Sequence, residues 1–178
     1  MNVLVIGDTH IPRRALSLPK KISEFIESKL FDLIICTGDL TERDVLEYFE
    51  TLAKVVVVRG NMDHLGLPDY SELKVEDVKV GVIHGHQVYP RGNREKLVEI
   101  GKQKSVDVLI SGHTHTPDIY MEDVLLLNPG SATGVWGGGG GSMKPSFIVL
   151  NVEGRKVDVK LYELERELSV RSERFYLK

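Results

Sequence analysis

The sequence predicts an α/β fold, and two observations support this prediction. Short apolar runs rich in β-branched residues alternate with segments of helical periodicity through the first two-thirds of the chain. These runs are almost continuously apolar, as expected for strands that are covered on both faces. The chain has 178 residues, 42% of them hydrophobic and 28% charged, so we expect one domain that spans residues 1–178.

The elements of the first two-thirds follow from periodicity. The apolar runs predict five strands, at Val3–Ile6, Leu33–Thr37, Val55–Arg59, Val80–His84 and Val106–Ser111. Helical periodicity between them predicts three helices, at Pro19–Ser28, Thr41–Leu52 and Asn93–Lys104. Thr41 and Asp44 have nearly the spacing of a capping box, which predicts the start of the second helix.

After His115 the texture of the sequence changes. It predicts four short strands, at Ile119–Met121, Val124–Leu127, Ser146–Val152 and Lys156–Glu163. Glu153-Gly154 is the expected tight turn of the last hairpin, so this half of the chain is predicted to be antiparallel. Gly134–Gly141 contains five consecutive glycines and is expected to form a mobile loop within the same fold.

Composition excludes several classes of function. The formal net charge is −3, without a long run of either sign, which disfavours a nucleic-acid-binding surface and a polybasic membrane anchor. The single cysteine, Cys36, excludes an intramolecular disulfide framework and a multi-cysteine zinc site. No apolar run approaches the roughly 18 residues of a membrane span, and no charged leader precedes the first run. We therefore expect a cytoplasmic protein without a membrane partner.

Polar residues with metal-binding side chains follow five of the predicted strands. The five segments are Gly7-Asp8-Thr9-His10, Gly38-Asp39, Gly60-Asn61-Met62-Asp63, His84-Gly85-His86 and Gly112-His113-Thr114-His115. Taken singly, each has an ordinary structural interpretation: an Asp that caps a helix, a Gly-Asn turn, or a surface histidine such as His64. Five of the six histidines nevertheless fall in these segments, and each segment contains a glycine that would let the backbone turn sharply.

The combined residues predict a metal centre with two ions. The seven candidate ligands are Asp8, His10, Asp39, Asn61, His84, His113 and His115. Seven ligands are too many for one ion. They suit two ions that lie about 3.5–4 Å apart and share one carboxylate. The mixture of imidazole, carboxylate and amide suits Mn²⁺, Fe²⁺, Zn²⁺ or Ni²⁺, whereas a site made only of oxygen would favour Mg²⁺ or Ca²⁺. We expect Mn²⁺ first, with Ni²⁺, Fe²⁺, Zn²⁺ and Mg²⁺ as alternatives.

The order of these segments resembles that of the calcineurin-like metallophosphoesterase superfamily: D-x-H, GD, GN-x-D/E, a His, and GH-x-H. The resemblance implies a two-sheet β-sandwich flanked by helices, with the metals at the carboxyl edge of the strands. It also implies a ligand set in which Asp8, His10 and His115 hold one ion, Asn61, His84 and His113 hold the other, and Asp39 bridges them.

Within that superfamily the chain resembles a small single-domain branch that includes compact phosphodiesterases and the scaffold subunit of the retromer coat. The shared segments include Cys36-Thr37-Gly38, His84-Gly85-His86-Gln87-Val88 and Asn128–Gly134. A protein-binding scaffold with little or no activity is therefore the alternative function. Asp39 favours the enzyme, since the resemblance implies an amide at this position in the scaffold subunit, and an amide offers one neutral oxygen where a carboxylate offers two charged ones.

The resemblance implies a phosphodiesterase that uses a hydroxide bridging two divalent metals. Few basic residues cluster near the motifs, which favours a small phosphodiester over long nucleic acid as the substrate. Asp39, Asp63 and His86 are the expected catalytic residues, the last two through contact with substrate or by orienting metal ligands. One departure is Met62, which stands where many members of the superfamily have a proton-donating histidine, and His64 is a conceivable substitute. The sequence leaves the physiological substrate open and allows a homo-oligomer.

Overall fold

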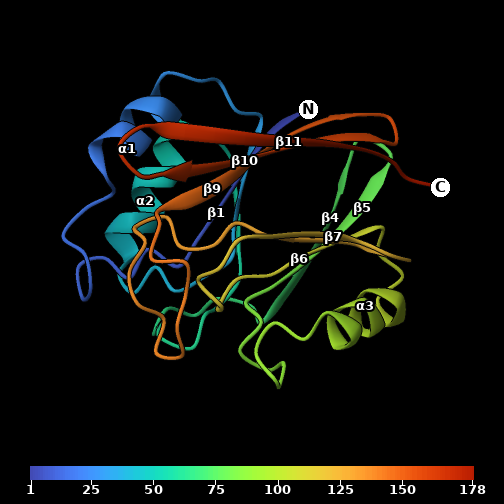
Figure 1. Ribbon diagram of the computed structural model, residues 1–178, viewed down its shortest axis with the longest axis horizontal. Coiled ribbons are helices and arrows are strands. Elements are labelled where there is room, and N and C mark those ends of the chain that lie inside the picture. The colour runs from blue at the N-terminus through green and yellow to red at the C-terminus, as the bar shows by residue number, and fades with distance from the viewer.

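A computed structural model describes residues 1–178 as two mixed β-sheets packed face to face, with helices on the two outer faces (Figure 1). The first sheet has the order β11-β10-β9-β1-β2-β3 and the second has the order β4-β5-β6-β8-β7. The strands of the first sheet are β1 (Asn2–Ile6), β2 (Leu33–Cys36), β3 (Val55–Val57), β9 (Ser146–Glu153), β10 (Lys156–Leu164) and β11 (Leu168–Tyr176). Those of the second are β4 (Tyr70–Val75), β5 (Val78–Ile83), β6 (Val108–Ile110), β7 (Asp118–Met121) and β8 (Leu125–Asn128).

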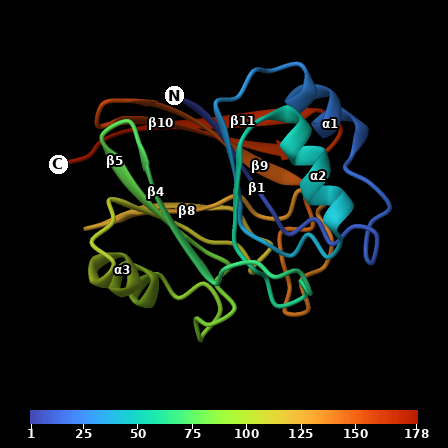
Figure 2. The same cartoon turned by 180° about the vertical axis from the view of Figure 1, so that it is seen from behind.

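Successive side chains along the central strands point to opposite faces of each sheet, and this alternation produces four layers: helices, first sheet, second sheet and helix. In β1, Val3 and Val5 point into the core between the two sheets, whereas Leu4 and Ile6 point to the opposite face. That opposite face packs against α1 (Lys20–Glu27) and α2 (Arg43–Leu52). The third helix, α3 (Arg94–Gln103), covers the outer face of the second sheet (Figure 2). The helix-flanked sandwich is confirmed, and the prediction of strands buried on both faces holds for β1, β2, β5 and β6, whereas β3, at the edge of its sheet, is only half-buried.

The strand predictions need three corrections. β4 and β11 are absent from the predicted elements, and β11 adds a hairpin after the one that was expected to be last. In the predicted antiparallel half, β8 pairs with β6 in parallel, because the chain crosses over through β7 before it returns. Glu153-Gly154 does form the turn between β9 and β10.

The three predicted helices are present, but the expected capping box of the second is wrong. The N-cap residue of α2 is Glu42, which makes no side-chain capping hydrogen bond. The Thr41 hydroxyl instead donates to the carbonyl of Ile11 and joins two loops at the carboxyl edge of the first sheet. None of the three helices has the length and apolar character that crossing a membrane requires.

Candidate metal centre

The seven predicted ligands lie where the two sheets present the carboxyl ends of their parallel strands. Three strands of the first sheet, β1, β2 and β3, are parallel neighbours, as are β5 and β6 in the second. Asp8 and His10 follow β1, Asp39 follows β2, His84 follows β5, and His115 follows β6. Parallel strands bring their carboxyl ends to one edge, so segments more than 100 residues apart in sequence meet there.

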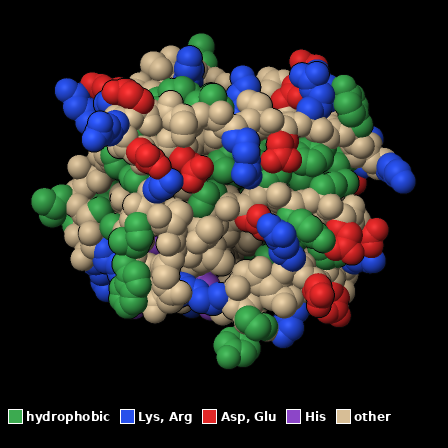
Figure 3. Space-filling model, viewed as in Figure 1, with side chains coloured by type: hydrophobic (Ala, Val, Ile, Leu, Met, Phe, Trp, Pro, Cys, Tyr) green, Lys and Arg blue, Asp and Glu red, His purple; other side chains and the backbone are tan.

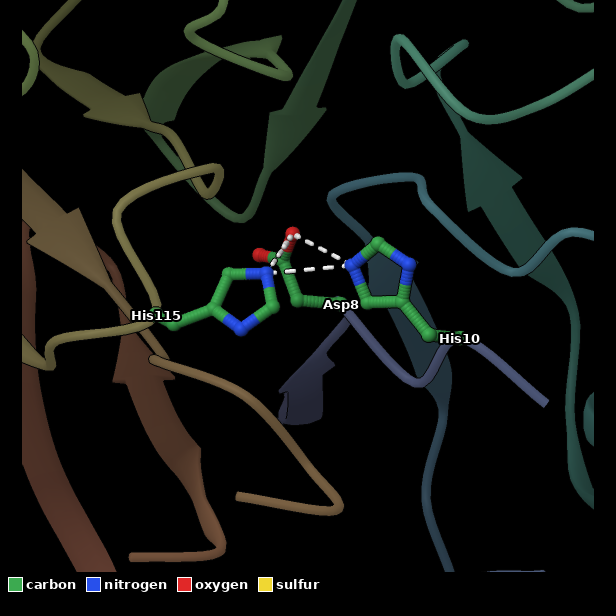
Figure 4. A group of neighbouring side chains, drawn as sticks. All are labelled: Asp8, His10 and His115. Atoms are coloured by element: carbon green, nitrogen blue, oxygen red, sulfur yellow. Dashed lines mark hydrogen bonds and ion pairs between the residues drawn. The ribbon is translucent and has the colours of Figure 1, made fainter. Parts of the chain in front are cut away.

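Asp8, His10 and His115 form one buried group (Figure 4). The Nε2 atoms of His10 and His115 are 3.1 Å apart, and Oδ1 of Asp8 lies 3.3 Å from the His115 Nε2 and 4.0 Å from the His10 Nε2. Figure 4 shows the two rings edge to edge, with the carboxylate next to their facing nitrogens. All three side chains are almost fully buried.

Asp8, Asp39 and His84 form a second group that shares Asp8 with the first. Oδ2 of Asp39 lies 3.4 Å from Nε2 of His84 and 3.4 Å from Nε2 of His10, so this one oxygen faces both groups. The amide oxygen of Asn61 lies 3.1 Å from Nε2 of His84. Asp39 thus lies between the two groups, and so does Asp8, which belongs to both.

His113 is at the margin of this cluster. Its ring centroid is 5.1 Å from that of His84, and its side chain is only partly buried. Its backbone N–H donates to Oδ2 of Asp8 at 3.0 Å, which holds the carboxylate with Oδ1 toward the imidazoles. The structure thus brings six of the predicted ligands into direct contact and places His113 beside them.

The ligand loops have an unusual backbone conformation. Five of the seven predicted ligands have a positive φ: Asp8, His10, Asp39, His113 and His115, with values between 49° and 69°. This left-handed region is uncommon for residues other than glycine, and such outliers cluster at functional sites. The expectation that the glycines make the sharp turns is therefore only partly right, because the ligands themselves adopt the turning conformation.

Glycine is needed here mainly for space. A Cβ at Gly60 would lie 2.0 Å from Oδ1 of Asp39, and one at Gly112 would lie 2.6 Å from Oδ2 of Asp8. Neither residue has a positive φ. These glycines let neighbouring backbone approach the two shared carboxylates.

The electrostatics of the group favour a paired carboxylate and imidazole. Burial alone would raise the pKa of Asp39, but its hydrogen bond and charge interaction with His84 lower this pKa to about 2. Burial alone would likewise lower the pKa of His84, but the hydrogen bond to Asp39 and the charges of Asp8 and Asp39 raise it to about 9. Burial, together with the charges of His84 and Arg91, lowers the pKa of His113 to about 4.

The residues fit a divalent cation. Oδ1 of Asp8, the oxygen that faces His10 and His115, is a buried polar atom without a hydrogen-bond partner. Leaving a buried carboxylate oxygen unpaired is costly, and a cation between Asp8, His10 and His115 would satisfy it. Nδ1 of His84 lies 2.7 Å from the Thr37 carbonyl. If Nδ1 donates its proton to this carbonyl, Nε2 of His84 is left free for a cation.

The other expected catalytic residues differ in position. Asp63 is buried, and its carboxylate accepts three backbone N–H bonds, from Asp39, Thr41 and Gly60, each of 2.8 Å. It therefore holds the loops that carry Asp39 and Asn61. This geometry favours the orienting role over contact with substrate, and Asp63 is better described as a positioning residue.

His86 and Met62 lie closer to the solvent side. His86 is exposed, with its ring centroid 5.5 Å from that of His84 and 6.3 Å from that of His113. Met62 is half-buried, and its backbone N–H donates to Oδ1 of Asp39 at 2.8 Å. His64 is exposed and makes no hydrogen bond or ion pair with the cluster. In Figure 3 histidine reaches the surface only in a small area low in the view, beside a basic side chain.

Two contributors to the site are missing from the sequence prediction. The carbonyl of Val135 lies 2.6 Å from Nδ1 of His115, and Arg91 donates from Nη2 to the carbonyls of His113 and Gly137. A backbone carbonyl leaves no mark on residue identity, so sequence could not reveal the first. Arg91 follows the predicted strand end at His84 by seven residues, and only its basic charge near a motif pointed toward it.

Comparison with known proteins identifies the family to which the chain is similar. A family model described as "Calcineurin-like phosphoesterase superfamily domain" matches residues 1–155. The chain is 55% identical over 134 residues to a "Probable metallophosphoesterase" of Methanocaldococcus jannaschii, which covers 75% of this chain and 69% of that protein.

Two solved structures have the same fold. Vacuolar Protein Sorting 29 from Cryptosporidium parvum superposes with a TM-score of 0.94 at 28% identity, covering 98% of this chain and 97% of that one. Wild-type Vps29 from Entamoeba histolytica, crystallised in complex with Zn²⁺, superposes with a TM-score of 0.86 at 36% identity and covers 98% of each chain.

Proposed function

Because the chain belongs to the calcineurin-like phosphoesterase superfamily, we propose that it is a metal-dependent phosphoesterase that hydrolyses small phosphodiesters. The observation that carries this proposal is the position of Asp39. One ionised oxygen of this buried carboxylate faces a histidine of each group at 3.4 Å, as a residue shared by two cations must. The name of the M. jannaschii relative supports the same activity.

The seven residues would hold two divalent cations, with Asp8, His10 and His115 on one side, Asn61, His84 and His113 on the other, and Asp39 between them. Such ions supply positive charge for phosphate oxygens and lower the pKa of water. Mn²⁺ is the ion that we expect first, since the ligand set mixes nitrogen and oxygen. The complex of E. histolytica Vps29 with Zn²⁺ supports a transition-metal site in this fold.

The remaining residues position these ligands and receive the substrate. Asp63 fixes the loops of Asp39 and Asn61 through three backbone hydrogen bonds. His86 is exposed beside His84 and His113, where it can donate a hydrogen bond to a phosphate oxygen or to the leaving group. The protein's part in the reaction is thus largely positioning.

Two features support a diester over a monoester. Met62 cannot donate a proton, so a leaving group must depart as an anion or take its proton from elsewhere. A monoester also brings more negative charge. Nη2 of Arg91 already donates to the carbonyls of His113 and Gly137, and Nη1 of Arg14 donates to that of Trp136, so part of the donor capacity of these two arginines is engaged with backbone.

The proposal is tested by metal analysis and a substrate panel. Metal-free protein should take up two Mn²⁺ per chain, and the loaded protein should hydrolyse an aryl phosphodiester faster than the matching monoester. The variant Asp39→Asn is the negative control for both measurements. Failure of the wild type to take up any divalent ion would overturn the proposal.

A protein-binding scaffold is the second candidate, and the similarity to Vacuolar Protein Sorting 29 over nearly the whole chain favours it. The two candidates separate in one measurement. A scaffold predicts that fully metal-loaded protein shows no turnover above that of Asp39→Asn on any member of the panel, whereas the enzyme predicts a clear difference.

A further inference from the structure

The segment Val135–Ser142, here called the glycine collar, lies against the metal-ligand candidate His115 at several points. At its start, the Val135 carbonyl is 2.6 Å from Nδ1 of the His115 ring. At its end, the backbone N–H of Ser142 donates to the His115 carbonyl at 3.0 Å. The collar therefore contacts both the ring and the backbone of the same residue.

Two glycines of the collar are packed so closely that a side chain would collide with His115. A Cβ at Gly137 would lie 2.8 Å from Cγ and 2.9 Å from Cδ2 of the His115 ring. A Cβ at Gly141 would lie 2.9 Å from the His115 Cβ. The φ of Gly137 is outside the left-handed region, so at this position only the contact with the ring requires glycine.

Two arginines tie the collar to the other ligand loops. Arg14 donates from Nη1 to the Trp136 carbonyl at 2.8 Å, and its own backbone N–H donates to the carbonyl of His10. Nη2 of Arg91 donates to the Gly137 carbonyl at 2.9 Å and to the carbonyl of His113. The collar is thus joined to the loop of His10, to the loop that follows His84 and carries Arg91, and to the loop of His113 and His115. It contacts the ring of His115 alone.

From these contacts we propose that the glycine collar is a positioning element that sets the metal affinity of the group formed by Asp8, His10 and His115. With Nδ1–H of His115 donated to Val135, the lone pair of Nε2 points toward Asp8 and His10. The proposal rests on the proposed function, because it assumes that this group holds a cation. It assigns a role in the site to Gly137 and Gly141, the first and last of the five consecutive glycines, which would otherwise be only a loop.

The first test is the variant Gly137→Ala, compared with Gly66→Ala. A Cβ at Gly66 meets no atom within 4 Å, and its φ is also outside the left-handed region, so it is a matched control. Mn²⁺ is titrated calorimetrically into metal-free protein. We expect Gly137→Ala to weaken one of the two sites by about 10- to 100-fold, the usual effect of disturbing a group that orients a metal ligand. The other site and the control should keep the wild-type affinity.

A second pair of variants covers the case in which Gly137→Ala fails to fold. Arg14 and Arg13 are adjacent and both exposed, but only Arg14 is bound to the collar. Arg14→Met should weaken the same site on the order of fivefold, the equivalent of one hydrogen bond, and Arg13→Met should leave it unchanged.

A third measurement needs no metal. Two-bond ¹H–¹⁵N correlation spectra of histidine-labelled, metal-free protein should show His115 as the Nδ1–H tautomer in the wild type and a mixture in Gly137→Ala. Unchanged affinities and an unchanged tautomer in Gly137→Ala and Arg14→Met would overturn the collar proposal. Absence of Mn²⁺ binding by the wild type would overturn the proposed function instead, and the tautomer would still decide whether the collar orients the His115 ring.

Discussion

Replacement of Asp63 by asparagine tests whether this carboxylate holds the ligand loops together. The side chain is 5% exposed, and its two oxygens accept backbone N–H groups from Asp39, Gly60 and Thr41, each at 2.8 Å. An asparagine offers one acceptor oxygen, so at least one of these N–H groups would face an amide NH₂. Hydrogen bonds to a charged group contribute about 1.5–3 kcal/mol, and a buried unpaired donor costs about 1–3 kcal/mol. We expect Asp63→Asn to lower the free energy of unfolding by roughly 2–4 kcal/mol.

The assay is urea unfolding of metal-free protein in the presence of a chelator, followed by circular dichroism. Asp69→Asn is the matched control, since it removes the same charge from an exposed pair with Arg59 and should cost no more than about 1 kcal/mol. Because Asp63 holds the loops of Asp39 and Asn61, its loss should also weaken Mn²⁺ binding.

Equal losses of stability in the Asp63 and Asp69 variants would refute the reasoning. So would an Asp63→Asn protein of normal stability and metal content that has lost turnover, because that result would place Asp63 in contact with the substrate rather than with the backbone.

Three further predictions follow from the geometry of the ligands. Removal of metal by a chelator should abolish hydrolysis, and Mn²⁺ should restore it. The pKa of His84 is raised to about 9 in the metal-free protein, so metal binding at pH 7 should release a proton, and metal affinity should increase as the pH rises toward 9. Calorimetry in buffers of different ionisation enthalpy measures this proton release. Asp39→Asn should cost more activity than His86→Ala. Because His86 lies outside the ligand set, its replacement should lower activity by about 10- to 100-fold. Comparable losses in the two folded variants would show that the roles are misassigned. Met62→His should raise turnover more for poor leaving groups than for activated ones, with general acid catalysis contributing on the order of 100-fold when the geometry is right; an unchanged ratio would mean that position 62 does not face the leaving group.

The predicted and observed strands differ mainly at the sheet edges. β4 and β11 each lie at the edge of a sheet, where one side of the strand has no neighbour. Edge strands are often charged, which protects them from pairing with another molecule. Glu72 and Lys74 in β4, and Arg171, Glu173 and Arg174 in β11, interrupt the apolar run by which the inner strands were recognised. The other two edge strands, β3 and β7, contain short apolar runs, so a criterion based on such runs finds them with the inner strands and misses β4 and β11.

The candidate site could be predicted from sequence to the extent that it depends on side-chain type at strand ends. Parallel strands bring their carboxyl ends together, so Asp8, Asp39 and His84 could be placed at one edge from the strand pattern alone. The contributions of the Val135 carbonyl and the backbone N–H groups held by Asp63 depend on how loops fold over the site. Such contacts are independent of the identity of the residue that supplies the backbone group, which is why sequence did not reveal them.

The left-handed ligands imply a conflict between the stability of the fold and its capacity to bind metal. A left-handed conformation costs a residue with a Cβ roughly 1–2 kcal/mol, and asparagine and aspartate bear it most easily. His10, His113 and His115 all adopt it, so their combined cost is a sizeable part of the roughly 5–15 kcal/mol by which a typical domain is stable. Glycine at these positions would relieve the backbone while removing a ligand. Selection for thermal stability of the metal-free chain alone would therefore erode the site, whereas selection in the presence of metal would preserve it.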